Sequence, residues 1–238
     1  MENSQSPRKN LSSKPFLISF SGMDGSGKST QIERLSNDLA NAGFNVKRMQ
    51  FWDNVVAFSS MRAGFSKRVL QSDGQIGSPE KPANRNDKNA KKWYLTFGRH
   101  VLYFFDAMKL RQVTSRVLSS DADVIIFDRY LYDQLATLPL QRSFTQSYAN
   151  FLLKFVPKPN VAFVIDAVPE VARARKPEYP LDFMHRYRKA YLQLSQIAGL
   201  TVIPPSEIEE AHTAIVTTLE SRMQQGISGS GIPSEIPA

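Results

Sequence analysis

Residues 22–30 combine glycines, a lysine and hydroxyl groups at a spacing that suits phosphate binding. They match the pattern G-x-x-x-x-G-K-[ST] and lie between an apolar run and a stretch with helical spacing. Glycines let successive backbone N–H groups point inward, and a helix N-terminus adds partial positive charge, so the segment predicts a cradle for an anion. We expect it to bind ATP, with Lys28 reaching the β- and γ-phosphates and Ser29 binding Mg²⁺. The predicted ATP-binding residues are Gly22, Met23, Asp24, Gly25, Ser26, Gly27, Lys28, Ser29 and Thr30.

An acid and a base, Asp128 and Arg129, directly follow the apolar run 124–127. They lie just past the carboxyl end of a predicted buried strand, where open α/β sheets bind ligands. Asp128 is a candidate for holding magnesium through water, and the planar guanidinium of Arg129 suits a second phosphate group. The alternative is structural, with Asp128 capping the next turn and Arg129 paired with a surface carboxylate.

Three cations, Arg173, Arg175 and Lys176, fall within four residues shortly after the apolar run 161–166. Placed over a transferring phosphoryl group, such cations accelerate the reaction by roughly 10³- to 10⁵-fold. The alternative is a solvated helix face. The phosphate cradle earlier in the chain favours the catalytic interpretation.

These residues need a scaffold, and the apolar pattern predicts one. Short apolar runs of strand length alternate with longer stretches of helical spacing, which is typical of βαβ units on a parallel sheet. We predict strands at 16–21, 46–52, 123–128, 161–166 and 200–203. After the cradle a first helix ends near Gly43, and further helices are predicted at 93–118, 131–136, 144–155, from 169 onward, 181–198 and 207–223.

Composition and charge limit the domain organisation and the partners. The chain has 238 residues, of which 42% are hydrophobic, a formal net charge of +8 and no cysteine. We expect one globular domain over 15–224, flexible tails at 1–14 and 225–238, and a mobile polar insert at about 72–92. The positive charge favours polyanionic partners, but part of it lies in the N-terminal tail and the insert, so a dedicated nucleic-acid surface is not expected.

The sequence lacks both cysteine and long apolar runs, which excludes proteins that depend on cysteine chemistry and proteins that span a membrane by a helix. Without cysteine the chain has no disulfides, thiolate metal sites or thiol nucleophiles. No apolar run reaches the roughly 18 to 20 residues that span a bilayer, and no apolar segment follows the basic residues near the N-terminus. We therefore expect a cytoplasmic protein that does not enter the membrane.

Taken together, these segments resemble the thymidylate kinase family, in the nucleoside monophosphate kinase group of P-loop kinases, from Phe16 to about Ile203. Residues 128–130 look like the family's Asp-Arg-Tyr element, and 165–175 and 181–192 are similar to the strand that enters its lid and the helix beyond. The resemblance implies an α/β, three-layer P-loop kinase fold with a central, mostly parallel five-stranded sheet flanked by helices. It also implies a short lid at about 173–181 and, since family members often form dimers, a homodimer.

The resemblance also implies roles for individual residues. Arg129 would bind the phosphate of the acceptor, and Asp24 would help to hold the acceptor sugar and order the metal. The chain departs from the family on the acceptor side: residues 50–54 replace an expected Arg-Glu-Pro-Gly-Gly block, and Asp133 replaces a serine. The residues assigned to the acceptor are Asp24, Asp53, Arg62, Phe105, Lys109, Arg129 and Asp133, and those assigned to catalysis are Lys28, Asp24, Arg129, Arg173 and Arg175.

Three functions are compatible with these features. In the leading hypothesis ATP phosphorylates a nucleoside monophosphate, either dTMP to dTDP or a related pair, and no general base is needed because the attacking phosphate oxygen is already ionised. In the second, the acceptor is the hydroxyl of a nucleoside and Asp53 serves as the base. In the third, the protein binds nucleotides with reduced or lost catalysis.

Overall fold

The computed structural model describes residues 14–55 and 93–228, in which strands and helices alternate. The strands are β1 (Phe16–Ser21), β2 (Val46–Gln50), β3 (Val124–Asp128), β4 (Val161–Ile165) and β5 (Thr201–Ile203). The helices are α1 (Lys28–Asn41), α2 (Phe51–Asn54), α4 (Trp93–Val117), α5 (Leu131–Leu135), α6 (Ser143–Phe155), α7 (Pro169–Arg175), α8 (Leu181–Ala198) and α9 (Ile208–Ser228).

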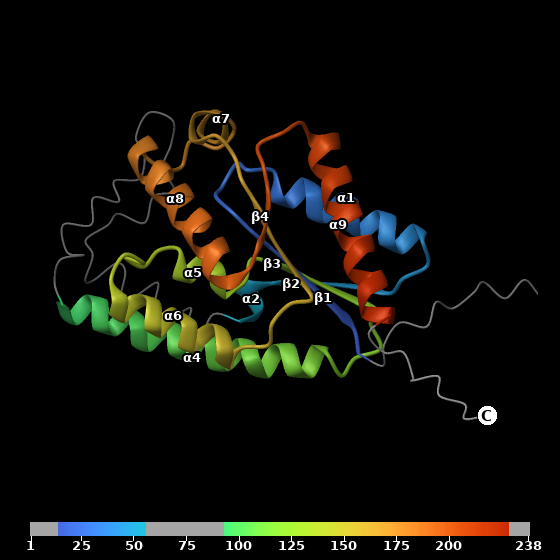
Figure 1. Ribbon diagram of the computed structural model, residues 1–238, viewed down its shortest axis with the longest axis horizontal. Helices are drawn as coiled ribbons and strands as arrows, with labels where there is room; N and C mark the ends of the chain where they lie inside the picture. Colours follow the sequence, from blue (N-terminus) through green and yellow to red (C-terminus); the bar gives the residue numbers. More distant parts are fainter. Residues whose placement is uncertain (1–13, 56–92, 229–238) are drawn as a thin grey trace, which may run out of the picture.

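The five strands form one sheet in the order β2-β3-β1-β4-β5, and every neighbouring pair is parallel (Figure 1). In the register, Asp128 at the end of β3 lies opposite Phe20 of β1 and Gln50 of β2. The carboxyl ends of these strands therefore meet at one edge of the sheet, where the loops that follow them can build a common site. The predicted α/β fold with a parallel five-stranded sheet is confirmed.

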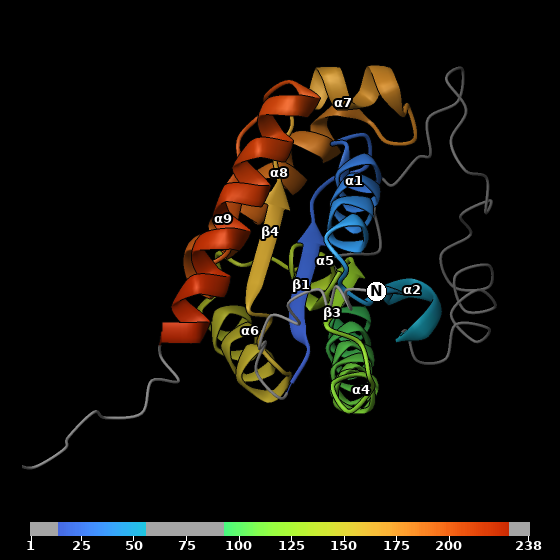
Figure 2. The same cartoon turned by 90° about the vertical axis from the view of Figure 1, so that its right-hand side faces the viewer.

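Helices cover both faces of the sheet and make three layers. Leu17 and Ile125 face a core shared with α4, α5, α6 and α8, whereas Ile18 and Ile126 face a second core shared with α1 and α9. Figure 2 looks onto the face that α1 and α9 cover. Because strand side chains alternate between faces, a run of consecutive apolar residues such as 124–127 is the expected sequence of a strand buried on both sides.

The end of α1 shows how local chemistry sets an element boundary. Gly43 adopts a left-handed backbone with φ of 87°. Its N–H donates to Ala40 O at 2.9 Å, and the N–H of Phe44 donates to Leu39 O at 3.0 Å. This pair of bonds is the Schellman arrangement that closes a helix at glycine, and it confirms the expected end of the first helix near Gly43.

Two predicted boundaries differ from the structure. The second strand was expected to reach Trp52, but β2 ends at Gln50 and the aromatic pair that follows begins the single-turn helix α2. The side chain of Asn54 accepts the N–H of Gln50 at 2.9 Å, which turns the chain where the aromatic residues alone favour extended backbone. The helix α9 continues to Ser228, into the expected C-terminal tail, because one glycine costs only about 1 kcal/mol in a helix.

The predicted insert at about 72–92, Arg62 and most of both tails lie outside the described residues. Among the described helices, none is long and apolar enough to cross a membrane.

Candidate functional site

The loop between β1 and α1 has a backbone that only glycines can adopt at three positions. Gly22, Gly25 and Gly27 have φ values of 141°, 82° and 92°. A Cβ on Gly22 would lie 2.5 Å from the backbone oxygen of Ile165, and one on Gly25 would lie 2.3 Å from that of Ala172. The loop is therefore curled and packed tightly against the chain after β4, which leaves its N–H groups and the start of α1 to face a ligand.

A cleft of about 640 Å³ opens above this loop at the carboxyl edge of the sheet. It combines the predicted ATP-binding residues from 24 to 30 with charged residues that follow β3, β4 and α7. The lining residues are Asp24, Gly25, Ser26, Gly27, Lys28, Ser29, Thr30, Gln31, Asp128, Arg129, Ile165, Asp166, Arg175, Lys176, Pro204, Ser206, Ile208 and Ala211.

Lys28 lies at the base of the cleft with its side chain buried. Its Nζ donates to the backbone oxygen of Met23 at 2.7 Å, a bond that holds the ammonium group inside the loop. Burial and the nearby positive charge of Arg129 lower the pKa of Lys28 to about 8, against the opposing effect of nearby carboxylates. A phosphate group in the loop would supply the negative charge that this buried cation lacks.

Arg129 is the one non-glycine residue with a left-handed backbone in the described part of the chain, with φ of 67°. Its N–H donates to Phe20 O at 2.8 Å, which ties it to the end of β1. One nitrogen of its guanidinium, Nη2, bonds to Asp24 Oδ1, and the other, Nη1, donates to Asp133 Oδ1 at 2.9 Å. Burial lowers the pKa of Arg129, but the two carboxylates outweigh it and hold the pKa above its ordinary value.

Asp133 lies beneath the cleft rather than on its surface, since only 1% of the residue is exposed. Besides Arg129, its carboxylate accepts bonds from Ser21 Oγ at 2.6 Å, Tyr191 Oη at 2.7 Å and the N–H of Tyr130 at 3.2 Å. The sequence assigned Asp133 to the acceptor. The structure places it one layer below, where it contacts Arg129 and does not line the cleft.

The short helix α7 brings cations over the cleft, but not both of the predicted arginines. Arg175 and its neighbour Lys176 line the cleft, whereas Arg173 does not. Lys176 Nζ pairs with Glu178 at 3.1 Å. The two arginines are two positions apart on a helix and so point in different directions, which the spacing alone could not resolve.

A small apolar cluster fixes α7 to the phosphate loop. The side chains of Met23, Ala167, Ala172 and Met184 pack together between the loop, α7 and α8. Met23, which the sequence assigned to ATP, does not line the cleft: its side chain packs in this cluster, and its backbone oxygen accepts Lys28 Nζ. Because this cluster joins the loop, α7 and α8, the cations of α7 are positioned by the same residues that shape the cradle.

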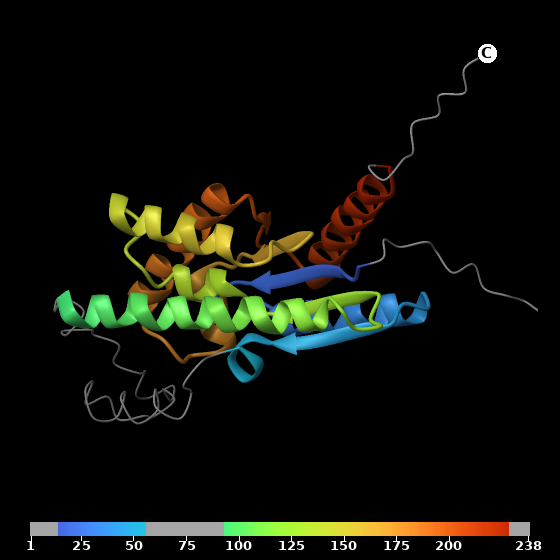
Figure 3. The same ribbon diagram turned by 90° about the horizontal axis from the view of Figure 1, so that it is seen from below.

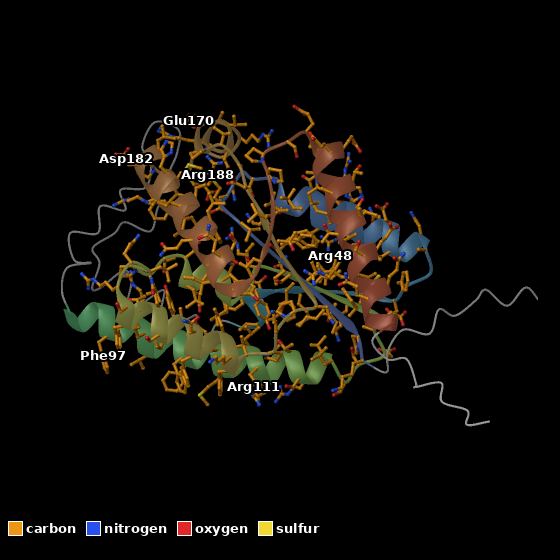
Figure 4. All side chains as sticks on the ribbon, viewed as in Figure 1. Arg48, Phe97, Arg111, Glu170, Asp182 and Arg188 are labelled. Carbon is orange, nitrogen blue, oxygen red and sulfur yellow. The ribbon has the colours of Figure 1, made fainter. Side chains whose placement is uncertain are left out.

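Several lining residues were missed by the sequence analysis. Asp166, the residue after β4, accepts two bonds from Arg188, at 2.8 Å from Nε and 2.7 Å from Nη2. Figure 4 shows Arg188 on α8 below Glu170 of α7. Pro204 and other residues after β5 also line the cleft. The sequence could have indicated both Asp166 and Pro204, because each follows the carboxyl end of a predicted parallel strand, as Asp128 does.

Comparison with known proteins agrees with this architecture, although no protein-family model matches the chain. A probable thymidylate kinase of Archaeoglobus fulgidus is 23% identical over 87% of this chain and 95% of its own length. One of Pyrobaculum aerophilum is 26% identical over 87% and 97%. The thymidylate kinase of Caenorhabditis elegans is 28% identical over 67% and 66%.

Two solved structures share the fold. The thymidylate kinase of Ehrlichia chaffeensis has a TM-score of 0.56 at 15% identity, covering 87% of this chain and 98% of that one. That of Candida albicans has a TM-score of 0.58 at 19% identity, covering 90% and 93%. The chain is thus similar to thymidylate kinases over most of its length. The sequence relatives support a nucleotide-binding kinase, and the two solved structures share its α/β P-loop fold.

Of the residues that the sequence assigned to the acceptor, Asp24 and Arg129 line the cleft, but the others that the structure describes do not. Phe105 and Lys109 lie on α4 and Asp53 lies on α2, and none of these three lines the cleft. Asp53 is exposed to solvent, as is Phe105. The remaining candidate, Arg62, is outside the described residues. The structure thus brings together the ATP side of the site and Arg129, but not these three side chains.

The residues assigned to magnesium fit that ion. Ser29 and Asp128 both line the cleft and both present oxygen, the ligand that Mg²⁺ prefers. Within the described residues there is no group of three or more histidine, aspartate or glutamate side chains that could hold a metal by themselves. Mg²⁺ usually completes its coordination with waters and substrate phosphates, so two protein oxygens beside a phosphate cradle are a suitable set.

Proposed function

We propose that the protein transfers the γ-phosphoryl group of ATP to a nucleoside monophosphate, with dTMP as the first candidate acceptor. The observation that carries this proposal is that one cleft holds two cations suited to phosphate, each fixed by a different part of the chain. Lys28 belongs to the loop that would hold ATP, and Arg129 is anchored after β3 by its own carboxylate partners. Two anchored cations suit a reaction between two phosphorylated substrates.

Catalysis in this proposal rests on alignment and on electrostatic stabilisation of the transferring group. Lys28, Arg175 and Lys176 would surround the negative charge that moves between the two nucleotides. Mg²⁺ held by Ser29 and, through water, by Asp128 would draw charge from the phosphates of ATP. The acceptor oxygen is ionised at neutral pH, so no side chain has to remove a proton from it.

The pair between Asp24 and Arg129 gives the acceptor a defined place to bind. Asp24 lies at the cleft with 19% of its side chain exposed, and it occupies Nη2 of Arg129. A phosphate dianion carries more charge than a carboxylate and can displace Asp24 from this nitrogen. Asp24 would then be free to contact the acceptor sugar, the role that the family resemblance implies for it.

The part of the cleft that follows β5 suits the base of ATP. There Pro204, Ile208 and Ala211 provide apolar surface and Ser206 a hydroxyl. A flat base needs apolar contact on its faces and a few polar groups at its edge. We place the adenine there, with the triphosphate running back toward Lys28.

The other two hypotheses have no comparable support. A hydroxyl acceptor needs a carboxylate at the reacting oxygen, but Asp53 is exposed on α2 and does not line the cleft. A protein that only binds nucleotides has no need for a complete catalytic set, whereas Lys28, Ser29, Asp128 and Arg129 all line one cleft.

The proposal is tested by ADP release from ATP and Mg²⁺ with a panel of nucleoside monophosphates and free nucleosides. We expect turnover with at least one monophosphate, and we expect Asp53→Ala to leave that rate within about twofold, as for surface changes elsewhere. Turnover with nucleosides only, lost in Asp53→Ala, would support the hydroxyl-acceptor reaction instead. ATP binding without turnover on any acceptor would favour the binding protein.

We also propose that the protein forms a homodimer through α4 and α6 and works in the cytoplasm. Figure 3 shows α4 running the length of the molecule, and the ring of Phe104 on α4 stacks 6.3 Å from that of Phe151 on α6. Apolar side chains remain exposed on the outer sides of both helices, namely Phe97, Val101, Phe105, Met108, Phe144 and Phe151. In a dimer with two-fold symmetry the aromatic face of one protomer would pack against the same face of its partner and bury these side chains.

The dimer is tested by sedimentation equilibrium of the wild-type protein and of Phe151→Glu. We expect a dimer that the charge at position 151 converts to a monomer, because an unpaired carboxylate would be buried in the interface. Val171→Glu changes a similarly exposed apolar residue on α7 and should leave the dimer intact. A wild-type monomer, or equal effects of both variants, would contradict the proposal.

A further inference from the structure

A buried carboxylate beneath the cleft carries a role that the proposed function does not require. Asp133 is 1% exposed and does not line the cleft, yet its carboxylate bonds to Arg129, which does. We propose that Asp133 is a positioning residue that holds Arg129 in the orientation needed to bind the acceptor phosphate, and that it thereby sets the affinity for the acceptor. The inference rests on the proposed function for the identity of the acceptor, but the geometry that supports it does not.

The carboxylate of Asp133 is fully used inside the protein. Oδ1 accepts Nη1 of Arg129 at 2.9 Å and the hydroxyl of Tyr191 at 2.7 Å. Oδ2 accepts the hydroxyl of Ser21 at 2.6 Å and the N–H of Tyr130 at 3.2 Å. Four donors on two oxygens satisfy a carboxylate without any contribution from a substrate. The charge of Asp133 is therefore directed at Arg129 and not at the contents of the cleft.

The two nitrogens of the guanidinium are divided between unlike partners. Nη1 faces Asp133, whose side chain is 0% exposed, and Nη2 faces Asp24, whose side chain is 19% exposed. An incoming phosphate can displace Asp24 toward solvent, but it cannot displace a carboxylate that lies below the floor of the cleft and has three further donors. Arg129 would thus keep one fixed bond and offer the other side of its fork to the acceptor.

Asp133 also fixes the backbone on which Arg129 stands. Arg129 has a left-handed φ of 67°, which a non-glycine residue keeps only when its surroundings enforce it. The N–H of Arg129 is held by Phe20 O at 2.8 Å, and the next N–H, that of Tyr130, is held by the Asp133 carboxylate at 3.2 Å. Loss of this carboxylate would loosen both the side chain of Arg129 and its backbone.

Two tyrosines of α8, Tyr187 and Tyr191, form hydrogen bonds with Asp133 and with each other. The hydroxyl of Tyr191 lies 3.1 Å from that of Tyr187, and Tyr187 donates to the backbone oxygen of Asp133 at 3.0 Å. Tyr191 Oη also lies 3.3 Å from the backbone oxygen of Gly22, at the start of the phosphate loop. Burial and the charge of Asp133 raise the pKa of Tyr191 well above its ordinary value, so it remains a donor at neutral pH. The positioning network therefore spans β1, α5 and α8.

The first experiment compares Asp133→Asn with wild type, using the monophosphate that turns over in the panel. We expect KM for that monophosphate to rise roughly tenfold to a hundredfold, the range for losing a charged hydrogen bond, while KM for ATP stays within about twofold. Asp123→Asn is the matched control, because Asp123 accepts the N–H of Asn45 at 2.8 Å at the opposite end of the sheet. Equal increases in both KM values, or no increase for the monophosphate, would overturn the inference.

A second experiment separates positioning from general stability by chemical rescue. Arg129→Ala leaves a space beside Asp133 that free guanidinium can enter at millimolar concentration. We expect added guanidinium to restore part of the activity of Arg129→Ala but none of that of the Arg129→Ala, Asp133→Asn double variant. Equal rescue of both variants would show that Asp133 does not orient the group.

A crystal structure of Asp133→Asn makes the test independent of the acceptor. We expect the Arg129 guanidinium to move away from residue 133. The hydrogen bond between the hydroxyls of Tyr187 and Tyr191 should remain. An unchanged Arg129 would overturn the inference whatever the acceptor proves to be. If instead Arg129 moves but no monophosphate is phosphorylated by the wild type, the proposed function fails and the positioning role of Asp133 stands.

Discussion

The two halves of the site are built in different ways. The proposed donor half consists of the continuous loop 22–30 and the start of α1, and its shape follows from local backbone chemistry. The proposed acceptor half is assembled around Arg129, with partners from β1, the phosphate loop, α5 and α8 that are as far as 169 positions apart in the chain. A contiguous motif carries its own geometry, whereas a dispersed site depends on which side of each element faces inward.

The largest expected effect tests whether the donor half is indispensable. Lys28→Ala should reduce turnover by roughly 10³-fold or more with every acceptor, because the cation that stabilises the transferring charge is lost. The measurement is ADP release at saturating ATP, with folding checked by thermal melting. A variant that keeps its rate with one acceptor would show that the P-loop does not serve the reaction.

The shape of the loop can be tested without any substrate. Gly25→Ala should lower the free energy of unfolding by about 2 kcal/mol or more, because the new Cβ would meet the backbone of Ala172 and the residue has a positive φ. Gly43→Ala is the control, since Gly43 also has a positive φ but open space where its Cβ would lie, and it should cost about 1 kcal/mol. Equal losses in urea unfolding would contradict tight packing of the loop against α7.

The two arginines of α7 test which side of this helix serves the cleft. Arg175→Ala should lower kcat about tenfold, because Arg175 lines the cleft, whereas Arg173→Ala should change kcat less than about twofold. Steady-state kinetics of the two variants side by side give the answer. The reverse order would mean that α7 rotates or moves when substrates bind.

The last expected effect concerns pH. The pKa of Lys28 is about 8 in the empty site, and a bound triphosphate would raise it. Below that pH the lysine is charged with and without ATP, so affinity should be constant; above it the free protein must take up a proton to bind, so affinity should fall by up to about tenfold per pH unit. Titration calorimetry from pH 7 to 9.5 would detect this fall, and Lys28→Met should lack it.

The sequence was most informative where local chemistry decides the structure. The apolar run of β1, the glycines of the loop and the end of α1 at Gly43 were all predictable, because each depends on a few neighbouring residues. The same holds for Asp128 and Arg129, since the end of a buried parallel strand fixes where they lie.

Other features depend on contacts that no spacing reveals. The aromatic pair Phe51 and Trp52 favoured a longer β2, but a turn closed by the side chain of Asn54 prevails. Whether Arg173 or Arg175 faces the cleft depends on the rotation of α7, which the packing of Ala172 on the loop determines. The buried position of Asp133 follows from partners distant in the chain and could not be deduced from its place after Arg129.

The most direct test of the account is to identify the product of the reaction. The wild-type protein with ATP, Mg²⁺ and each nucleoside monophosphate of the panel can be followed by ³¹P NMR, which distinguishes a nucleoside diphosphate from a monophosphate. We predict that ATP and one monophosphate are converted to two diphosphates in equal amounts, and that Arg129→Ala requires far more acceptor to do so. New monophosphate formed from free nucleosides, with the added monophosphates unchanged, would contradict it.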